Sequence, residues 1–190
     1  MIKAIFTLTF LLAGLLPVNS WAASQVHQVD PQTNIETWSV SQHGVTFSLT
    51  QILPDQSRAF YINRGFTLEQ IEPFAQACVY MTVLRNDDAP DVIRYSLEDW
   101  SIVSQEGTRQ PVRIDEWMNR LQATGAGKSA MIAFRWAQFP PRQEYEPGGD
   151  WNQGMLTTGL PPGSKFDVVA RWQLQGKTYE NVLTEVRCAK

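Results

Sequence analysis

Short segments in which apolar and polar residues alternate with a period of two recur along the chain. Such alternation predicts β-strands with one buried face, and turn-forming residues separate most of these segments. His43-Gly44 is typical of a hairpin turn, and residues 175–177 indicate a second hairpin near the end of the chain. The expected strands are 35–40, 45–50, 59–62, 79–84, 93–97, 100–103, 131–136, 166–172 and 179–186.

Helical periodicity is much rarer than strand alternation in this chain. Thr67 and Gln70 have the spacing of a capping box, in which each side chain bonds the backbone amide of the other residue, and apolar residues follow at helical spacing. Pro73 limits the length of this helix, so we expect it to end near Ala77. Residues 114–121 predict a second short helix with one apolar face.

This order of elements predicts an all-β fold class. Many short strands, with one or two short helices in connections, are typical of an antiparallel immunoglobulin-like β-sandwich. No internal repeat or long linker divides the pattern, so we expect residues 35–190 to form a single β-sandwich domain. Residues 23–34 are polar and contain Pro31, which indicates an extended N-terminal segment rather than a packed element.

The first 22 residues have a composition of their own. Lys3 precedes an apolar run over residues 4–18, and the small residues Ser20 and Ala22 follow that run. This three-part pattern is typical of a secretory signal peptide, with cleavage after Ala22. The alternative is a membrane anchor, but a spanning helix needs about 20 apolar residues and this run is shorter. We therefore expect a periplasmic or secreted protein that has no stable membrane anchor after cleavage.

The charge of the chain bears on its partners. It has 16 Lys and Arg against 19 Asp and Glu, a formal net charge of −3, and loss of Lys3 with the signal peptide would change this to −4. Such a chain lacks the surplus of cations that neutralises phosphates, so nucleic acid is not an expected partner. An envelope protein or a small ligand is the expected partner instead.

The two cysteines, Cys78 and Cys188, would both remain in the mature protein. In an oxidising compartment an even number of cysteines indicates disulfide bonding, and two cysteines allow one intramolecular bond. Two buried free thiols are the alternative. A bond between these residues would join the last predicted strand to the middle of the chain.

Sequence signatures of catalysis are missing. Only two histidines are present and no Gly-x-Ser-x-Gly motif occurs, so a histidine-assisted nucleophile is not expected. The acidic pairs Asp87-Asp88, Glu98-Asp99 and Asp115-Glu116 lie in polar surroundings, where adjacent carboxylates are usually solvated. We expect a non-catalytic protein, and a hydrolase with a carboxylate-based site is the alternative.

Copper binding is a further alternative, because imidazole and thioether groups are ligands that suit copper. His43 at the predicted hairpin turn, and possible participation of His27, would provide the metal site. The spacing of these residues with the methionines matches no metal motif. The simpler interpretation, which we favour over copper binding, is a polar turn histidine and a second histidine in a polar N-terminal segment. The methionines considered are Met81, Met118, Met131 and Met155.

The strongest candidate for a recognition site is the segment 137–163. It contains five prolines and five glycines among polar and aromatic residues, which predicts a long loop, and ordered loops of this length are often functional. Its side chains offer aromatic faces, one guanidinium group and amides, which could bind a partner protein or a small ligand. The alternative is that the segment only covers one end of the core. The candidate binding residues are Arg142, Tyr145, Trp151, Asn152 and Gln153.

Overall fold

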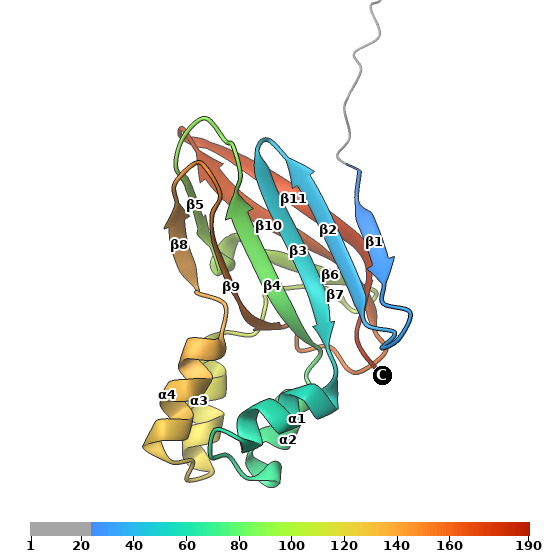
Figure 1. Cartoon of the computed structure of the whole chain (residues 1–190), viewed down its shortest axis with the longest axis vertical. Coiled ribbons are helices and arrows are strands. Elements are labelled where there is room, and N and C mark those ends of the chain that lie inside the picture. The colour runs from blue at the N-terminus through green and yellow to red at the C-terminus, as the bar shows by residue number, and fades with distance from the viewer. Residues whose placement is uncertain (1–23) are drawn as a thin grey trace, which may run out of the picture.

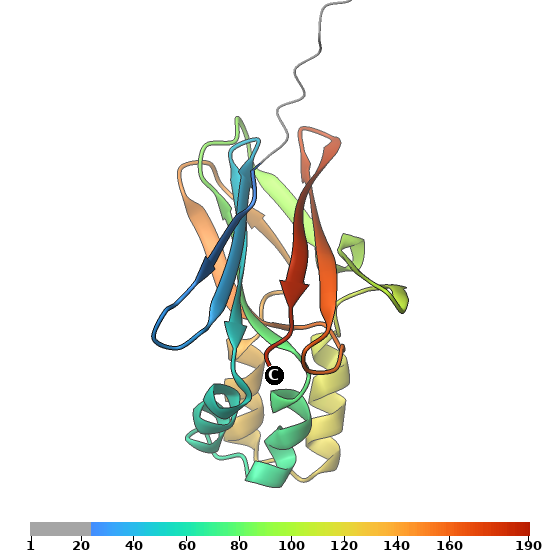
Figure 2. The ribbon, with the colours of Figure 1, turned by 90° about the vertical axis from the view of Figure 1, so that its right-hand side faces the viewer.

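The structure is a computed structural model that describes residues 24–190, so the predicted signal peptide lies outside the described residues. Two antiparallel β-sheets lie face to face, and four helices pack together at one end of them (Figure 1). Figure 2, turned by a quarter, shows the sheets edge-on as two separate layers above the helices. A functional site could therefore lie on the sheets, on the helices or at the junction between them.

The first sheet has the strand order β1-β2-β3-β4-β9. Its β2–β3 hairpin is the one predicted from the sequence, and His43 and Gly44 at its turn have φ of 54° and 74°. Positive φ at both central residues is the type I′ geometry, whose twist matches that of the strands it joins. The bounds are β1 Val26–Val29, β2 Glu36–Gln42, β3 Val45–Ile52, β4 Val79–Asn86 and β9 Asp150–Thr157.

The second sheet is built around β10, the long strand Lys165–Leu174. Strand β11 (Lys177–Arg187) pairs along one side of β10 through the second predicted hairpin. On the other side, β5 and β6 pair with different halves of β10, and the short helix η1 (Leu97–Asp99) interrupts the chain between them. The remaining bounds are β5 Ile93–Ser96, β6 Ser101–Ser104, β7 Gly107–Arg109 and β8 Arg142–Tyr145, where β7 and β8 are edge strands.

Large aromatic residues fill the space between the sheets. Trp38, Trp100 and Trp172 are each 1% exposed, and the Phe47 ring meets the edge of the Trp100 ring at a centroid distance of 5.1 Å. Strands β2 and β3 of the first sheet show the alternation of a strand with one buried face, and in β3 buried and partly buried residues alternate along its whole length. This is the alternation that the sequence showed, so the sandwich core was visible in the sequence.

The four helices form a second hydrophobic core at one end of the sandwich. Tyr61, Phe74 and Phe134 are completely buried there, and their rings meet at centroid distances between 5.0 and 5.4 Å. Val79 of β4 and Met155 of β9 also belong to this cluster, which places the helices against one end of the first sheet. The bounds are α1 Pro54–Ile62, α2 Leu68–Ala75, α3 Ile114–Ala123 and α4 Lys128–Ala137.

Two of these helices were predicted. At the start of α2, Gln70 N donates to Thr67 Oγ1 over 3.3 Å, and Thr67 N donates to Gln70 Oε1 over 3.0 Å, which confirms the capping box. The predicted helix 114–121 is confirmed as α3.

The other two helices correct the sequence analysis, which expected strands at 59–62 and 131–136. Residues 59–62 end α1, and Pro54 is the first residue of that helix, a position where proline is well tolerated. In α4, Ala130 and Phe134 are buried four residues apart whereas Ile132 and Trp136 are exposed. The exposed apolar residues concealed the helical period. The prediction of at most two helices was therefore wrong, whereas the prediction of a largely antiparallel β-structure is confirmed.

Two expected irregular segments also contain strands. Residues 26–29 form β1, which pairs with β2 at the edge of the first sheet. Segment 137–163 is not one loop, because β8 and β9 lie within it and pair with β5 and β4. A polar edge strand has little apolar alternation, and Gly148-Gly149, both at positive φ, supplies the turn between β8 and β9.

The predicted disulfide bond is present. Cys78, just before β4, is bonded to Cys188, just after β11, and their Cα atoms are 5.1 Å apart. The bond therefore ties the end of the second sheet to the first sheet next to the helices. Arg187 O is fixed at the same place, because it accepts hydrogen bonds from Tyr80 OH over 2.6 Å and from Gln51 Nε2 over 2.7 Å.

We predict that Cys78→Ser/Cys188→Ser lowers the free energy of unfolding by about 4 kcal/mol, because the bond restricts an unfolded loop spanning a separation of 110 residues. Urea unfolding followed by tryptophan fluorescence measures the change. Reductant should move the wild-type transition towards that of the variant and leave the variant unmoved. Equal unfolding free energies for the two proteins would contradict the prediction.

Candidate ligand-binding cleft

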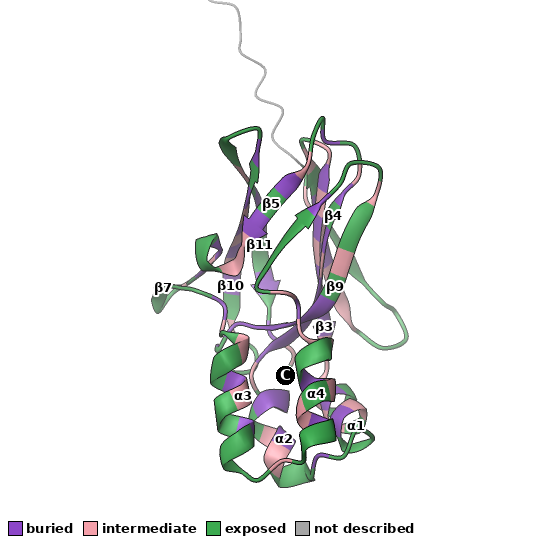
Figure 3. Ribbon diagram, turned by 90° about the vertical axis from the view of Figure 1, so that its left-hand side faces the viewer, coloured by how far each residue is buried: buried purple, intermediate pink, exposed green. Residues whose placement is uncertain are grey.

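A cleft of about 450 Å³ lies where the sandwich meets the helices. Four segments line it: residues 96–98 around η1, residues 110–115 leading into α3, residues 135–142 between α4 and β8, and part of β9. Figure 3 shows this side of the molecule, with β5 and β9 above α3 and α4. The volume lies within the range of about 300 to 1,000 Å³ that small-molecule sites occupy.

One wall of the cleft is the segment Gln138–Pro141, which is fixed by backbone contacts. Phe139 N donates to Met155 O over 2.9 Å, and Leu97 N donates to Pro141 O over 2.9 Å. Because proline cannot rearrange its φ and lacks an amide hydrogen, Pro140 and Pro141 stiffen this wall further. The wall is therefore an ordered surface of the cleft.

Gly154 of β9 allows this wall to approach the sheet. A Cβ atom on Gly154 would lie 2.3 Å from Phe139 N and 2.5 Å from Phe139 Cα, and both of these are backbone atoms that cannot move aside cheaply. The close approach brings residues 138 and 155 into a parallel bridge. Glycine is required here for space rather than for an unusual φ.

Two buried tyrosines support the wall from behind. Tyr95 OH donates to Pro140 O over 2.9 Å, and the Tyr95 and Tyr145 hydroxyl oxygens are 3.4 Å apart. Burial raises the pKa of Tyr145 to about 12 and raises the pKa of Tyr95 further. Both phenols are therefore protonated and uncharged at neutral pH, so their role here is to donate hydrogen bonds.

The opposite wall is held by Thr157 at the end of β9. Val112 N donates to Thr157 O over 2.9 Å, and Trp117 Nε1 of α3 donates to Thr157 Oγ1 over 2.8 Å. Together they position residues 110–115 along the cleft. The lining between the two walls is mainly apolar and includes Leu97, Pro111, Val112, Phe139, Pro140 and Leu156.

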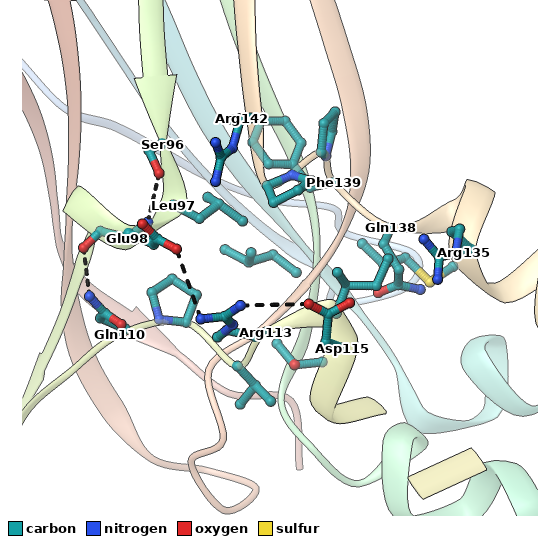
Figure 4. A pocket seen from close by; sticks show the side chains of 18 of the residues that line it. Ser96, Leu97, Glu98, Gln110, Arg113, Asp115, Arg135, Gln138, Phe139 and Arg142 are labelled. Atoms are coloured by element: carbon teal, nitrogen blue, oxygen red, sulfur yellow. Dashed lines mark hydrogen bonds and ion pairs between the residues drawn. The ribbon is translucent and has the colours of Figure 1, made fainter. Parts of the chain in front are cut away.

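The charged groups of the cleft fall into two sets (Figure 4). Arg113 bridges Glu98 and Asp115, with nitrogen to oxygen distances of 3.8 and 3.6 Å. Arg135 at the end of α4 and Arg142 at the start of β8 also line the cleft, and neither forms an ion pair with any residue in 24–190. Figure 4 shows Arg142 and Arg135 on different parts of the cleft wall.

The five residues predicted to bind a ligand or partner are distributed over three places. Arg142 and Asn152 line the cleft. Tyr145 is 1% exposed and belongs to the sandwich core, so its side chain does not lie at the surface. Trp151 and Gln153 alternate with Asn152 along β9, so they lie on the other face of the first sheet.

Sequence reasoning missed several residues of the cleft. Arg135 and Trp136 were assigned to a strand, and residues 110–114 and Leu97 were assigned no function. Trp136 carried a usable signal, because it precedes the Pro/Gly-rich segment, and it is now found 83% exposed at the cleft. Leu97 and residues 110–114 gave no such signal, because only the tertiary fold brings them to this place.

The two histidines are not brought together. His27 lies opposite Trp38 in the β1–β2 pair, where the rings stack at 4.9 Å, and His43 lies five residues further along at the hairpin turn. At about 3.3 Å per residue this separates them by roughly 16 Å along the strand. His43 instead lies 4.7 Å from the ring of Tyr179. A copper site that uses both histidines therefore has no support in this geometry.

The acidic pairs behave differently from one another. One residue from each of two pairs, Glu98 and Asp115, reaches the cleft, where Arg113 bridges them. Both carboxylates therefore face a guanidinium group, which favours an ion-pair network rather than an acid and base acting on a substrate. In the third pair, Asp87 accepts a hydrogen bond from Thr46 Oγ1 over 2.6 Å, away from the cleft.

Within residues 24–190, no helix is both long enough and apolar enough to cross a membrane. No protein-family model, curated protein or solved structure matches this chain. The geometry of the cleft is therefore the starting point for any functional proposal.

We predict that Gly154→Ala destabilises the protein by about 1 to 3 kcal/mol, because the new Cβ must displace the backbone of Phe139. Gly127→Ala is the matched control, since Gly127 has φ of −65° and its Cβ would meet nothing within 4 Å. That control should change the free energy of unfolding by less than about 0.5 kcal/mol. Urea unfolding of the three proteins provides the comparison, and equal stabilities would contradict the steric argument.

Proposed function

We propose that this protein is an exported, non-catalytic binding protein whose ligand site is the cleft between the sandwich and the helices. The observation that carries the proposal is the composition of the cleft. It combines an apolar lining with two arginines that have no ion-pair partner within residues 24–190. A mostly apolar cleft with a few polar groups is the usual form of a small-molecule site. Of the two expected partners, an envelope protein and a small ligand, we therefore propose a small ligand.

The chemistry of the lining favours binding over catalysis. Its polar groups within the described chain are guanidinium groups, amides, two bridged carboxylates and hydroxyls, and neither histidine lies among them. Ser96 is engaged locally, since its Oγ accepts from Glu98 N over 3.3 Å. These groups can position and hold a ligand, but the cleft offers no serine or thiol paired with a base.

That the two sheets form an immunoglobulin-like sandwich remains a prediction. The two antiparallel sheets agree with it, and four helices at one end are an addition that the sequence analysis did not foresee.

Export is the part of the proposal that concerns the compartment. The disulfide bond is compatible with an oxidising environment. We predict that the protein purified from an exporting bacterial host begins at Ala23, as intact-mass measurement and N-terminal sequencing would show. Recovery of a chain that still begins at Met1 from the cytoplasmic fraction would contradict export.

We predict that the wild-type protein binds N-phenyl-1-naphthylamine, a neutral apolar dye, and that Asn152→Trp weakens this binding at least about ten-fold. The new indole would enter the cleft and occupy the volume that the dye needs. Titration of dye fluorescence at constant protein concentration measures the affinity, with tryptophan excited separately as a check on protein concentration.

Gln153→Trp is the matched control, because it adds the same side chain at the next position on β9 but on the opposite face of the sheet. It should bind the dye as the wild type does. Thermal unfolding of both variants tests whether they remain folded. Unchanged dye affinity in folded Asn152→Trp, or absence of dye binding in the wild type, would rule out the cleft as the site.

A further inference from the structure

The arginines of this chain are almost all engaged by the protein itself. Nine of the eleven form an ion pair with a carboxylate or, for Arg64, lie over the Phe60 ring and bond its carbonyl. Arg135 and Arg142 are the two that have no such contact within residues 24–190, and both line the cleft. The cleft therefore carries two guanidinium groups whose hydrogen-bond donors are available to a ligand.

The overall charge makes this arrangement more informative. The chain has a formal charge of −3, yet the cleft is lined by three arginines against two carboxylates, and Arg113 already bridges both carboxylates. A local cationic site in an acidic protein favours anionic ligands. The dipole of α4 favours a cation at Arg135, but it leaves the donors of that guanidinium group free.

The positions of the two arginines are set by the ordered wall between them. Arg135 precedes Gln138 by one helical turn, and Gln138 Nε2 donates to Tyr61 OH over 2.7 Å. Arg142 directly follows Pro141, whose carbonyl accepts from Leu97 N. Both ends of the wall are therefore anchored. A guanidinium group on an anchored backbone can bind the two oxygens of a carboxylate, sulfate or phosphate with little loss of backbone freedom.

The rest of the cleft suits an apolar group. Leu97, Val112 and Leu156 line it together with the prolines of the wall. Trp136 extends the apolar surface outward at the cleft edge, where it is 83% exposed. An exposed indole beside free guanidinium groups is suited to a molecule that is partly apolar and partly charged. An inorganic anion alone would leave this apolar surface without a function.

We infer that the cleft binds an amphiphilic anion, a single apolar chain or ring system that carries one carboxylate, sulfate or phosphate group. Arg135 and Arg142, on different parts of the cleft wall, each offer a guanidinium group that can bind the anionic group, and the apolar part lies between the wall and residues 110–115. This inference rests on the proposed function, since it assigns a ligand class to the same cleft. A fatty acid and a phosphorylated lipid fragment share this chemistry.

The test is displacement of N-phenyl-1-naphthylamine from the full mature protein by three ligands that differ only in their polar group. These are decanoate, decan-1-ol and decylammonium, all kept below their aggregation concentrations at neutral pH. Decanoate should compete about ten-fold better than the other two. Inorganic phosphate alone should not displace the dye, and decyl phosphate in a parallel titration shows which headgroup is preferred.

Arg135→Gln/Arg142→Gln should remove the preference for decanoate and leave dye binding and displacement by decan-1-ol unchanged. The matched control is Arg94→Gln/Arg120→Gln, which removes two cations from exposed ion pairs that do not line the cleft. The control should retain the preference, which separates a specific role of the two cleft arginines from a general effect of net charge.

The remaining outcomes each have one meaning. Equal displacement by all three decyl compounds would overturn the anionic assignment while leaving the cleft as a binding site. Displacement by inorganic phosphate alone would replace the amphiphile with a small anion. A decanoate preference that survives in Arg135→Gln/Arg142→Gln would overturn the role of these arginines. Failure of the dye to bind at all would instead contradict the proposed function.

Discussion

The ends of β4 and β9 next to the helices must be buried on both faces at once, and the rest of the architecture depends on this constraint. Tyr80 and Leu156 are paired in register and face the sandwich core, whereas Val79 and Met155 face the helical core. A sheet with one exposed face could not hide the second set of apolar side chains. The helices cover this end of the sheet, and the two cores share these strands.

The cleft is a consequence of the same constraint. The chain must leave α4, pass the end of the first sheet and enter β8 in the second sheet within the few residues 138–141. It crosses directly over Gly154, where the absence of a side chain lets Phe139 reach the sheet. On the other side, residues 110–115 return from the second sheet to α3 and are held by Thr157. The space between these two crossings is the cleft.

The sequence predicted what depends on local pattern and could not predict what depends on tertiary position. The hairpins, the cap of α2, helix α3 and the disulfide bond each have a short-range or compositional signal. Helix α4 was not predicted, because Ile132 and Trp136 are apolar yet exposed, and this hides the helical period. Strand β9 was not predicted, because its polar half lies at a sheet edge and lacks the alternation of apolar and polar residues.

The candidate site shows the same division. Arg142 and Asn152 could be chosen from composition, but nothing in the sequence separates Asn152 from Gln153, which the strand directs to opposite faces. Tyr145 was chosen because its ring offers an aromatic face within the Pro/Gly-rich segment, but the ring lies in the sandwich core. Arg135 could not be chosen, since its significance lies in the absence of an ion-pair partner within residues 24–190.

Arg135 and Arg142 can remain without an ion-pair partner within residues 24–190 at little cost, because an exposed ion pair stabilises a fold only slightly. A pair such as Arg94 with Glu144 contributes at most about 1 kcal/mol to the free energy of unfolding. The stability of the fold therefore depends little on whether a surface arginine is paired. A cation at the edge of an apolar cleft is different. When a ligand excludes water there, the effective dielectric falls and a charge-assisted bond strengthens. The same arginines that add little to folding can therefore contribute strongly to binding, and only to a ligand that brings both an anion and an apolar group to the cleft.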